Sequence, residues 1–176
     1  MKVFAVSGLH TTGKTTTVVA LVGEFTLRGL KVSTVKDIHY EGFAMDKEGT
    51  NTWKHRMAGA STVVARSLDE TDFLVGGRMQ MEDVLHRLEA DVVIIEGGHE
   101  EPYPRITCAT TPDEADIRFD SHTFAVAGRI AEQMTEYRGV PAFNPMKDAS
   151  MLADLALAKA HVMEGFGSGR RNDRQA

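Results

Sequence analysis

The chain has 176 residues, which fits one domain with a sizeable core, since about 100 to 200 residues per domain is usual. Its 25 acidic and 20 basic residues give a formal net charge of -5 without a basic stripe, which argues against a nucleic-acid partner held through its phosphates. A single cysteine excludes an internal disulfide and favours a location in the cytoplasm. The sequence has no signal-peptide pattern and no apolar stretch near the roughly 20 residues that span a bilayer, so we expect a soluble protein without a membrane partner.

The first predicted strand, residues 3–6, leads into a glycine- and threonine-rich loop at residues 8–15 that fits the pattern GxxxxGK[ST]. A helix follows, with apolar residues at three- and four-residue spacing from Val18 to Phe25, and Gly29 ends it. Strand, loop and helix in this order are the context that a phosphate-binding loop (P-loop) requires. The sequence therefore predicts a nucleotide-binding site.

The residue types of this loop suit phosphate chemistry. Glycines let successive backbone amides converge on phosphate oxygens, and the start of the helix adds a partial positive charge. Lys14 is placed to reach the β- and γ-phosphates, and the Thr15 hydroxyl to bind a magnesium ion. The alternative is a strand-to-helix turn that fits the pattern by chance. The residues of this segment that we predict to bind nucleotide are Gly8, Leu9, His10, Thr11, Thr12, Gly13, Lys14, Thr15 and Thr16.

A second strand is predicted at residues 31–36, and with the first it makes a βαβ unit, which normally gives parallel strands. The polar loop at residues 37–51 contains His39 and Asp46 and follows Lys36 directly. Loops of this length are commonly functional or mobile. The next predicted elements are a short helix over 53–60, two strands over 62–65 and 72–75 that pair as an antiparallel extension, and a helix over 81–88.

The run of β-branched residues at 92–95 predicts a strand buried on both faces, and Glu96 follows it. A carboxylate at the C-terminal end of such a strand lies beside the P-loop, where open α/β sheets bind their ligands. Glu96 can there hold magnesium or polarise an attacking water. The alternative is a carboxylate that caps the turn begun by Gly97 and Gly98. After it we expect a polar, proline-stiffened rim at residues 99–105.

The C-terminal third predicts strands over 123–127 and 140–143, a helix over 130–137 between them, and a last helix over 149–161. Residues 144–148 resemble a base-reading N-K-x-D motif, but their spacing fails and we interpret them as a turn. We therefore expect an α/β P-loop NTPase fold over residues 1–164, with a mostly parallel sheet of six or seven strands flanked by helices, and a disordered tail at 165–176.

The seven histidines raise the question of a metal site. His39, His55 and His99 fall on the predicted nucleotide side, but none has the spacing of a metal-binding pair. Cys108 also lacks a partner at such spacing, and we expect it to be a small buried residue. Surface or hydrogen-bonded histidines are the simpler interpretation.

Several segments occur in an order that points beyond the P-loop. They are Arg28-Gly29-Leu30-Lys31-Val32, Val35-Lys36, the loop with Asp46 and Gly49, Lys54-His55, Ala58-Gly59-Ala60, Glu96-Gly97, Pro104-Arg105-Ile106 and, near the end, Val140-Pro141-Ala142-Phe143. With the P-loop, this order resembles the molybdopterin-guanine dinucleotide biosynthesis protein B (MobB) family of P-loop GTP-binding proteins. The resemblance covers residues 2–108 and the segment near the end. This chain departs from the family's pattern at Asp37, Asn51, Trp53 and Gly98.

The resemblance implies a cytoplasmic, usually homodimeric accessory protein with weak GTPase activity. Such a protein binds GTP and Mg²⁺ and assists the attachment of a guanine nucleotide to molybdopterin in molybdenum or tungsten cofactor maturation. Molybdopterin or its guanine dinucleotide is then a further ligand, and a cofactor guanylyltransferase or a molybdoenzyme is the partner. Carried over to this chain, Lys14, Asp46 and Glu96 are the catalytic residues, and Thr15, Asp46 and Glu96 hold the metal. Lys36, His39 and His55 belong to the family's second signature, and Lys36 and His39 join the residues that bind the cofactor.

Two other functions stay open. In a small-molecule kinase, the loop at 37–51 would hold the acceptor and Asp46 would act as its base. In a metal-delivery GTPase, His39 or His99 would bind zinc or nickel at a dimer contact. Guanine specificity itself follows from the resemblance alone.

Overall fold

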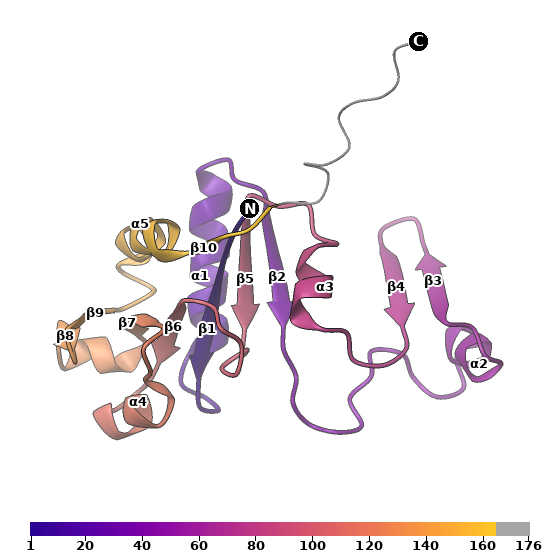
Figure 1. Ribbon diagram of the computed structural model, residues 1–176, viewed down its shortest axis with the longest axis horizontal. Coiled ribbons are helices and arrows are strands. Elements are labelled where there is room, and N and C mark those ends of the chain that lie inside the picture. The colour runs from indigo at the N-terminus through magenta and orange to yellow at the C-terminus, as the bar shows by residue number, and fades with distance from the viewer. Residues whose placement is uncertain (165–176) are drawn as a thin grey trace, which may run out of the picture. The chain divides into compact units, whose positions relative to one another are not determined.

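The computed structural model describes residues 1–164, and the predicted tail at 165–176 lies outside the described residues. The described chain divides into two compact units, one made of Ile38–Gln80 and the other of Met1–Asp37 together with residues 81–164 (Figure 1). We call them the smaller and the larger unit.

The described part of the larger unit contains an eight-stranded sheet in the order β2-β5-β1-β6-β7-β9-β8, with β10 paired to β1. The pairs from β2 through β9 are parallel, whereas β8 and β10 pair antiparallel to their neighbours. This confirms the predicted mostly parallel sheet. The strands are β1 (Lys2–Gly8), β2 (Val32–Lys36), β5 (Val92–Glu96), β6 (Arg105–Cys108), β7 (Thr123–Ala127), β8 (Glu136–Tyr137), β9 (Val140–Phe143) and β10 (His161–Val162).

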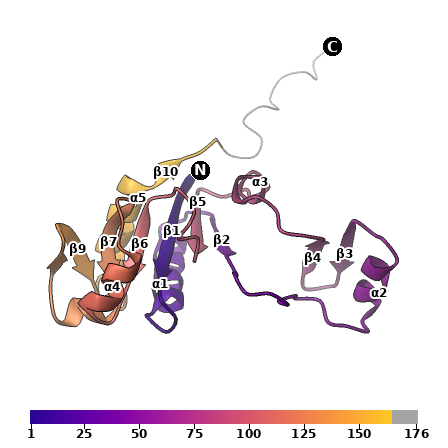
Figure 2. The same ribbon diagram turned by 60° about the horizontal axis from the view of Figure 1, so that its bottom comes forward.

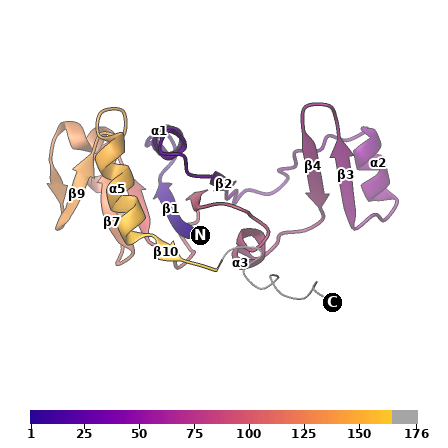
Figure 3. The same cartoon turned by 90° about the horizontal axis from the view of Figure 1, so that it is seen from above.

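Helices cover both faces of this sheet. Successive residues of a strand point to opposite faces, and on β1 Phe4 and Val6 pack in a cluster with α1 and α5, whereas Val3 and Ala5 pack with α3. Figure 3 shows α1 and α3 on opposite sides of β1. The helices of the larger unit are α1 (Lys14–Leu27), α3 (Met81–Leu85), α4 (Pro112–Arg118), the 3₁₀ helix η1 (Arg129–Glu132) and α5 (Ala149–Lys159).

The core is centred on β1 and its contact with α1. Phe4 makes edge-to-face contacts with Phe25 of α1 and Phe124 of β7, with ring centroids 6.3 Å apart in both pairs. Val18, Leu21 and Phe25 are all buried, so the apolar face predicted for this helix is confirmed. The packing anchors the start of α1, and therefore the P-loop, to the middle of the sheet.

The smaller unit contains a β-hairpin and a short helix (Figure 2). Its strands β3 (Thr62–Arg66) and β4 (Thr71–Val75) are antiparallel, as predicted. Helix α2 (Asn51–Met57) is capped by Thr50, whose hydroxyl accepts a hydrogen bond from the Trp53 amide. It is shorter than the predicted helix over 53–60 and starts earlier.

The predicted helix over 130–137 is wrong. The chain forms η1 and then the β8-β9 hairpin, whose two turn residues, Arg138 and Gly139, have φ angles of 47° and 82°. Two successive positive φ angles suit a tight hairpin turn and cannot continue a right-handed helix. The last helix also ends earlier than predicted, because His161 and Val162 pair with β1. In residues 1–164 no helix has both the length and the hydropathy that crossing a membrane requires.

Candidate functional site

The P-loop joins β1 to α1 through residues with unusual backbone angles. Gly8 has φ 147°, and a Cβ there would lie 2.4 Å from the carbonyl oxygen of Cys108. Gly13, at the start of α1, has φ 93°, and Thr11 has φ 63° although it is not a glycine. Backbone turns of this kind gather amide groups into an anion-binding concavity. The glycines of the motif are therefore required by the loop's geometry.

The start of α1 has no side-chain cap, which suits the binding of an anion. Among the described residues, no side chain caps this helix end, although the first turn of any helix leaves amide groups without internal partners. Lys14 folds back so that its Nζ donates to the carbonyl oxygen of Leu9 at 2.5 Å, and the Thr12 hydroxyl donates to the same oxygen at 2.9 Å. These contacts order the loop and keep an ammonium group beside the uncapped amides.

Glu96 lies at the end of β5, between strands β1 and β2. It pairs in register with Val6 of β1 and with Lys36 of β2. Its Oε1 accepts hydrogen bonds from the Thr15 hydroxyl at 2.9 Å and from Lys36 Nζ at 2.6 Å. The structure thus brings Thr15, Lys36 and Glu96 into direct contact next to Lys14.

The electrostatics keep this carboxylate charged. Burial raises the pKa of Glu96, but hydrogen bonds from Lys36 and Thr15 and the charges of Lys36 and Lys14 outweigh it, so the pKa lies below its ordinary value. An ionised carboxylate and a hydroxyl are the hard oxygen ligands that Mg²⁺ prefers, with phosphate and water oxygens filling its other positions. In residues 1–164 we find no group of three or more His, Cys, Asp or Glu side chains arranged to hold a metal. The donor set fits magnesium shared with a phosphate ligand.

A cavity of about 290 Å³ opens beside the P-loop. Residues 144–148 form the predicted turn, in which the amides of Lys147 and Asp148 donate to the carbonyl oxygen of Asn144. The first three residues of this turn line the cavity. The volume of the cavity is close to the lower end of the range for ligand pockets, roughly 300 Å³. The lining residues are Thr11, Thr12, Gly13, Thr16, Thr110, Gly128, Arg129, Glu132, Asn144, Pro145 and Met146.

Asp46, His39 and His55 belong to the smaller unit. Asp46 Oδ1 accepts hydrogen bonds from the hydroxyls of Thr50 and Thr52, both at 2.8 Å. The pKa of Asp46 lies below its ordinary value, chiefly because of the hydrogen bond from Thr50. Burial raises this pKa, whereas the hydrogen bond from Thr52 and the charge of Arg56 lower it further. These contacts give Asp46 a local role at the start of α2, and its role at magnesium stays a prediction.

Part of the site's surroundings was not predicted from the sequence. Strand β6 and helix α4 are absent from the predicted elements, and Arg105, expected in a polar rim, is 2% exposed at the start of β6. A signal for α4 was present, since Thr111 followed by Pro112 and Glu114 is a typical helix start. Thr110, Gly128 and Arg129 line the cavity without any local motif that marks them.

Comparisons with known proteins find relatives of similar sequence. The molybdopterin-guanine dinucleotide biosynthesis adapter protein of Haemophilus influenzae is 31% identical over 107 residues, which are 57% of this chain and 59% of that protein. The match therefore spans less than two thirds of that relative. The probable adapter protein of the same name from Bacillus subtilis is 23% identical over 158 residues, covering 88% of this chain and 90% of that protein.

Solved structures show the same fold. The crystal structure of Bacillus subtilis MobB matches with a TM-score of 0.75 and 22% identity, over 92% of this chain and 99% of that chain. A MobB homolog from Bacillus stearothermophilus matches with a TM-score of 0.65 and 21% identity, over 90% of this chain and 97% of that chain. The fold is that of a P-loop NTPase. A family model described as molybdopterin guanine dinucleotide synthesis protein B matches residues 3–129, and the chain belongs to this MobB family.

Proposed function

We propose that this chain binds magnesium-GTP and acts as an adapter in molybdopterin guanine dinucleotide synthesis. The observation that carries nucleotide binding is the contact of Thr15 with the ionised Glu96 beside the uncapped start of α1. The names of the relatives support the biosynthetic role, and the family supports guanine as the base.

Each part of the site has a distinct task in this proposal. The P-loop amides and Lys14 hold the phosphates, and Thr15 and Glu96 bind magnesium directly or through water. The nucleoside enters the cavity beside the P-loop and lies against Asn144, Pro145 and Met146 of the turn. Because Glu96 is shared by Lys36 and Thr15, it is a poor general base, and we expect slow hydrolysis.

We further propose that the protein works as a homodimer in the cytoplasm with a cofactor guanylyltransferase or a molybdoenzyme as partner. Molybdopterin or its guanine dinucleotide is the second ligand. As the family resemblance implies, His39 binds the cofactor and Asp46 binds magnesium. The single buried cysteine suits a reducing compartment.

The first experiment titrates the protein with GTP and with ATP, each with and without Mg²⁺, by isothermal titration calorimetry. We expect Mg²⁺ to strengthen GTP binding and GTP to bind more tightly than ATP. Lys14→Ala should abolish triphosphate binding while the circular dichroism spectrum stays unchanged, because the ammonium contacts phosphate and no core residue. Lys31→Ala, which alters an exposed lysine paired with Glu89, is the matched control. Equal affinity in Lys14→Ala and the unmodified protein would remove Lys14 from the site.

A further inference from the structure

The connection from β5 to β6 is unusually short. These strands are both parallel to β1 and lie on either side of it, so residues 97–104 must cross one face of the sheet. Parallel strands are generally joined by a dozen or more residues that include a helix. Here eight residues without a helix make the crossing, and Tyr103 packs on the face that carries α3. Such a loop needs another means of attachment.

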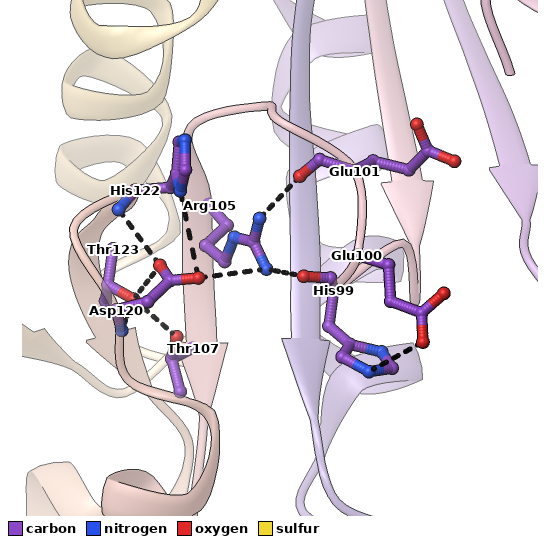
Figure 4. Close-up of polar contacts among 8 residues, drawn as sticks. All are labelled: His99, Glu100, Glu101, Arg105, Thr107, Asp120, His122 and Thr123. Carbon is purple, nitrogen blue, oxygen red and sulfur yellow. Dashed lines mark hydrogen bonds and ion pairs between the residues drawn. The ribbon is translucent and has the colours of Figure 1, made fainter.

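Arg105 provides this attachment. It points from the start of β6 toward the loop (Figure 4), where Nη1 donates to the carbonyl oxygen of His99 and Nη2 donates to that of Glu101 at 2.5 Å. Nη1 also forms an ion pair with Asp120 Oδ2 at 3.4 Å. The planar guanidinium can reach several acceptors at once, which a lysine ammonium cannot do in the same geometry.

The burial of this charge shows that the contacts matter energetically. Arg105 is 2% exposed, and a buried charge is costly unless acceptors surround it. Two loop carbonyls and one carboxylate provide that compensation, while its Nε has no hydrogen-bond partner in residues 1–164. Detaching the loop would therefore leave a poorly compensated charge, and this ties the loop's position to that of β6.

The carboxylate partner is itself held in place. Asp120 Oδ1 accepts a hydrogen bond from the His122 amide at 2.9 Å, and the Arg105 amide donates to the His122 carbonyl oxygen at 2.8 Å. The Thr123 hydroxyl contacts both Asp120 and Thr107. Figure 4 shows these groups on the β7 side of Arg105 and the loop on its other side. Arg105 thus connects three segments of the larger unit.

The crossover loop, residues 97–104, begins directly after Glu96, and its first residues have little conformational freedom. The Gly97 amide donates to Val6 O at 3.0 Å, and a Cβ on Gly97 would lie 2.9 Å from the Asp37 carbonyl oxygen. A Cβ on Gly98 would lie 2.8 Å from Cγ2 of Ile95. Only these two glycines separate Glu96 from His99, whose carbonyl Arg105 holds. A displacement of the loop is therefore transmitted to the end of β5.

We infer that Arg105 is a positioning residue for the magnesium-triphosphate site: by clamping the crossover loop it fixes Glu96 against Thr15. This inference rests on the proposed function, because it assigns Glu96 a part in magnesium binding. Arg105 itself touches neither the P-loop nor the cavity beside it.

The test uses the full chain with Arg105→Met, Arg105→Lys and the control Arg87→Met, which alters an exposed arginine. Amide hydrogen exchange, followed by NMR without nucleotide, measures directly how firmly the loop is held. In Arg105→Met we expect faster exchange at Gly97 and Glu101 and at Ala5, whose amide bonds to the Pro104 carbonyl oxygen. Exchange at Thr17, in the first turn of α1, should stay unchanged.

The second measurement is the factor by which Mg²⁺ strengthens GTP binding. Loss of a residue that supports a metal ligand typically costs about 10- to 100-fold in metal affinity, so this factor should fall about tenfold in Arg105→Met, while GTP affinity without Mg²⁺ is retained. Arg105→Lys keeps the positive charge but cannot make the double contact. We expect its thermal stability to be closer to that of the unmodified protein than is the factor by which Mg²⁺ strengthens its GTP binding.

The outcomes separate the inference from the function on which it rests. Unchanged exchange at Gly97 and Glu101 would overturn the clamp. Faster exchange with an unchanged Mg²⁺ factor would show a purely structural role and overturn the positioning. If the unmodified protein binds no nucleotide at all, the proposed function fails and the positioning role fails with it, whereas the exchange data still decide whether Arg105 clamps the loop.

Discussion

The contact between Lys36 and Glu96 has two sides, one for stability and one for ligand binding. Lys36 Nζ and the Thr15 hydroxyl both donate to Glu96 Oε1, so the ammonium of Lys36 lies where a cation is favoured. The lowered pKa of Glu96 means that the folded state prefers the ionised carboxylate. This preference contributes stability at neutral pH and is lost as the pH falls through the pKa of the folded state.

Lys36→Met should therefore make the stability less dependent on pH. At pH 7 we expect the free energy of unfolding to fall by less than ~1 kcal/mol, because the lysine is largely exposed and solvent screens the pair. Well below pH 4.5, the ordinary pKa of Glu96, the two proteins should converge. Urea unfolding at pH 7 and pH 3 measures the difference. A larger difference at pH 3 than at pH 7 would contradict the assigned sign.

Cys108 should be chemically silent in the folded protein. It is fully buried and in contact with the Thr17 hydroxyl, and burial raises the pKa of its thiol to about 11. The thiolate is the reactive form. We expect negligible reaction with a chromogenic disulfide reagent at pH 8 in buffer and one reactive thiol per chain in guanidinium chloride. Rapid reaction without denaturant would show that this part of the core opens readily.

At the scale of elements, Gly128 links β7 to the P-loop. It has φ 105°, and a Cβ there would lie 2.8 Å from the Ala109 carbonyl oxygen and 3.0 Å from that of Thr12. Gly139 has φ 82° with open space around its Cβ position. Both glycines therefore have a positive φ angle, but only Gly128 has other backbone atoms close to its Cβ position.

Gly128→Ala should reduce both stability and nucleotide affinity, whereas Gly139→Ala should reduce stability alone. The left-handed backbone angle at Gly139 costs an alanine about 1–2 kcal/mol. Gly128, with φ 105° and ψ -155°, lies in a region that essentially only glycine adopts, which costs about 1–3 kcal/mol, and only the substitution there also pushes on Thr12. Denaturant midpoints and GTP titrations of both variants check this. Equal GTP affinities would show that the P-loop tolerates the added methyl group.

Elements with strong local patterns could be predicted from the sequence, and those defined by tertiary contacts could not. Helix α1 has a periodic apolar face, and β5 is a continuous run of β-branched residues, so both were predicted. Strand β6 has four residues and begins with a buried arginine, which sequence alone assigns to a polar loop. The contact of Thr15 with Glu96 was predicted only as proximity, and the share that Lys36 takes in it depends on the β2-β5 register.

At the scale of the whole molecule, one face of the smaller unit's hairpin is apolar and exposed. Val64 pairs with Phe73, and Val75 lies on the same face; these side chains are 50%, 71% and 43% exposed. On the opposite face, Val63 is buried. A hairpin of two strands is marginally stable alone, and an exposed apolar face commonly marks a contact between proteins. We therefore predict that this face takes part in the proposed homodimer.

Phe73→Ser should shift the protein from dimer to monomer in sedimentation velocity, because it removes the largest side chain of that face. Leu68→Ser is the control, since Leu68 is fully exposed in the turn between the strands. A monomeric unmodified protein, or an unchanged dimer in Phe73→Ser, would exclude this face as the dimer contact.

The smaller unit is inserted where β2 ends, between Asp37 and the start of α3. Without those residues, β2, α3 and β5 would form an ordinary crossover between neighbouring parallel strands, and their pairing needs nothing from the insertion. The splice point lies at the carboxyl edge of the sheet, where ligands of open α/β folds are bound. The insertion can therefore be exchanged or remodelled in evolution while the strand pairing of the larger unit's sheet stays intact.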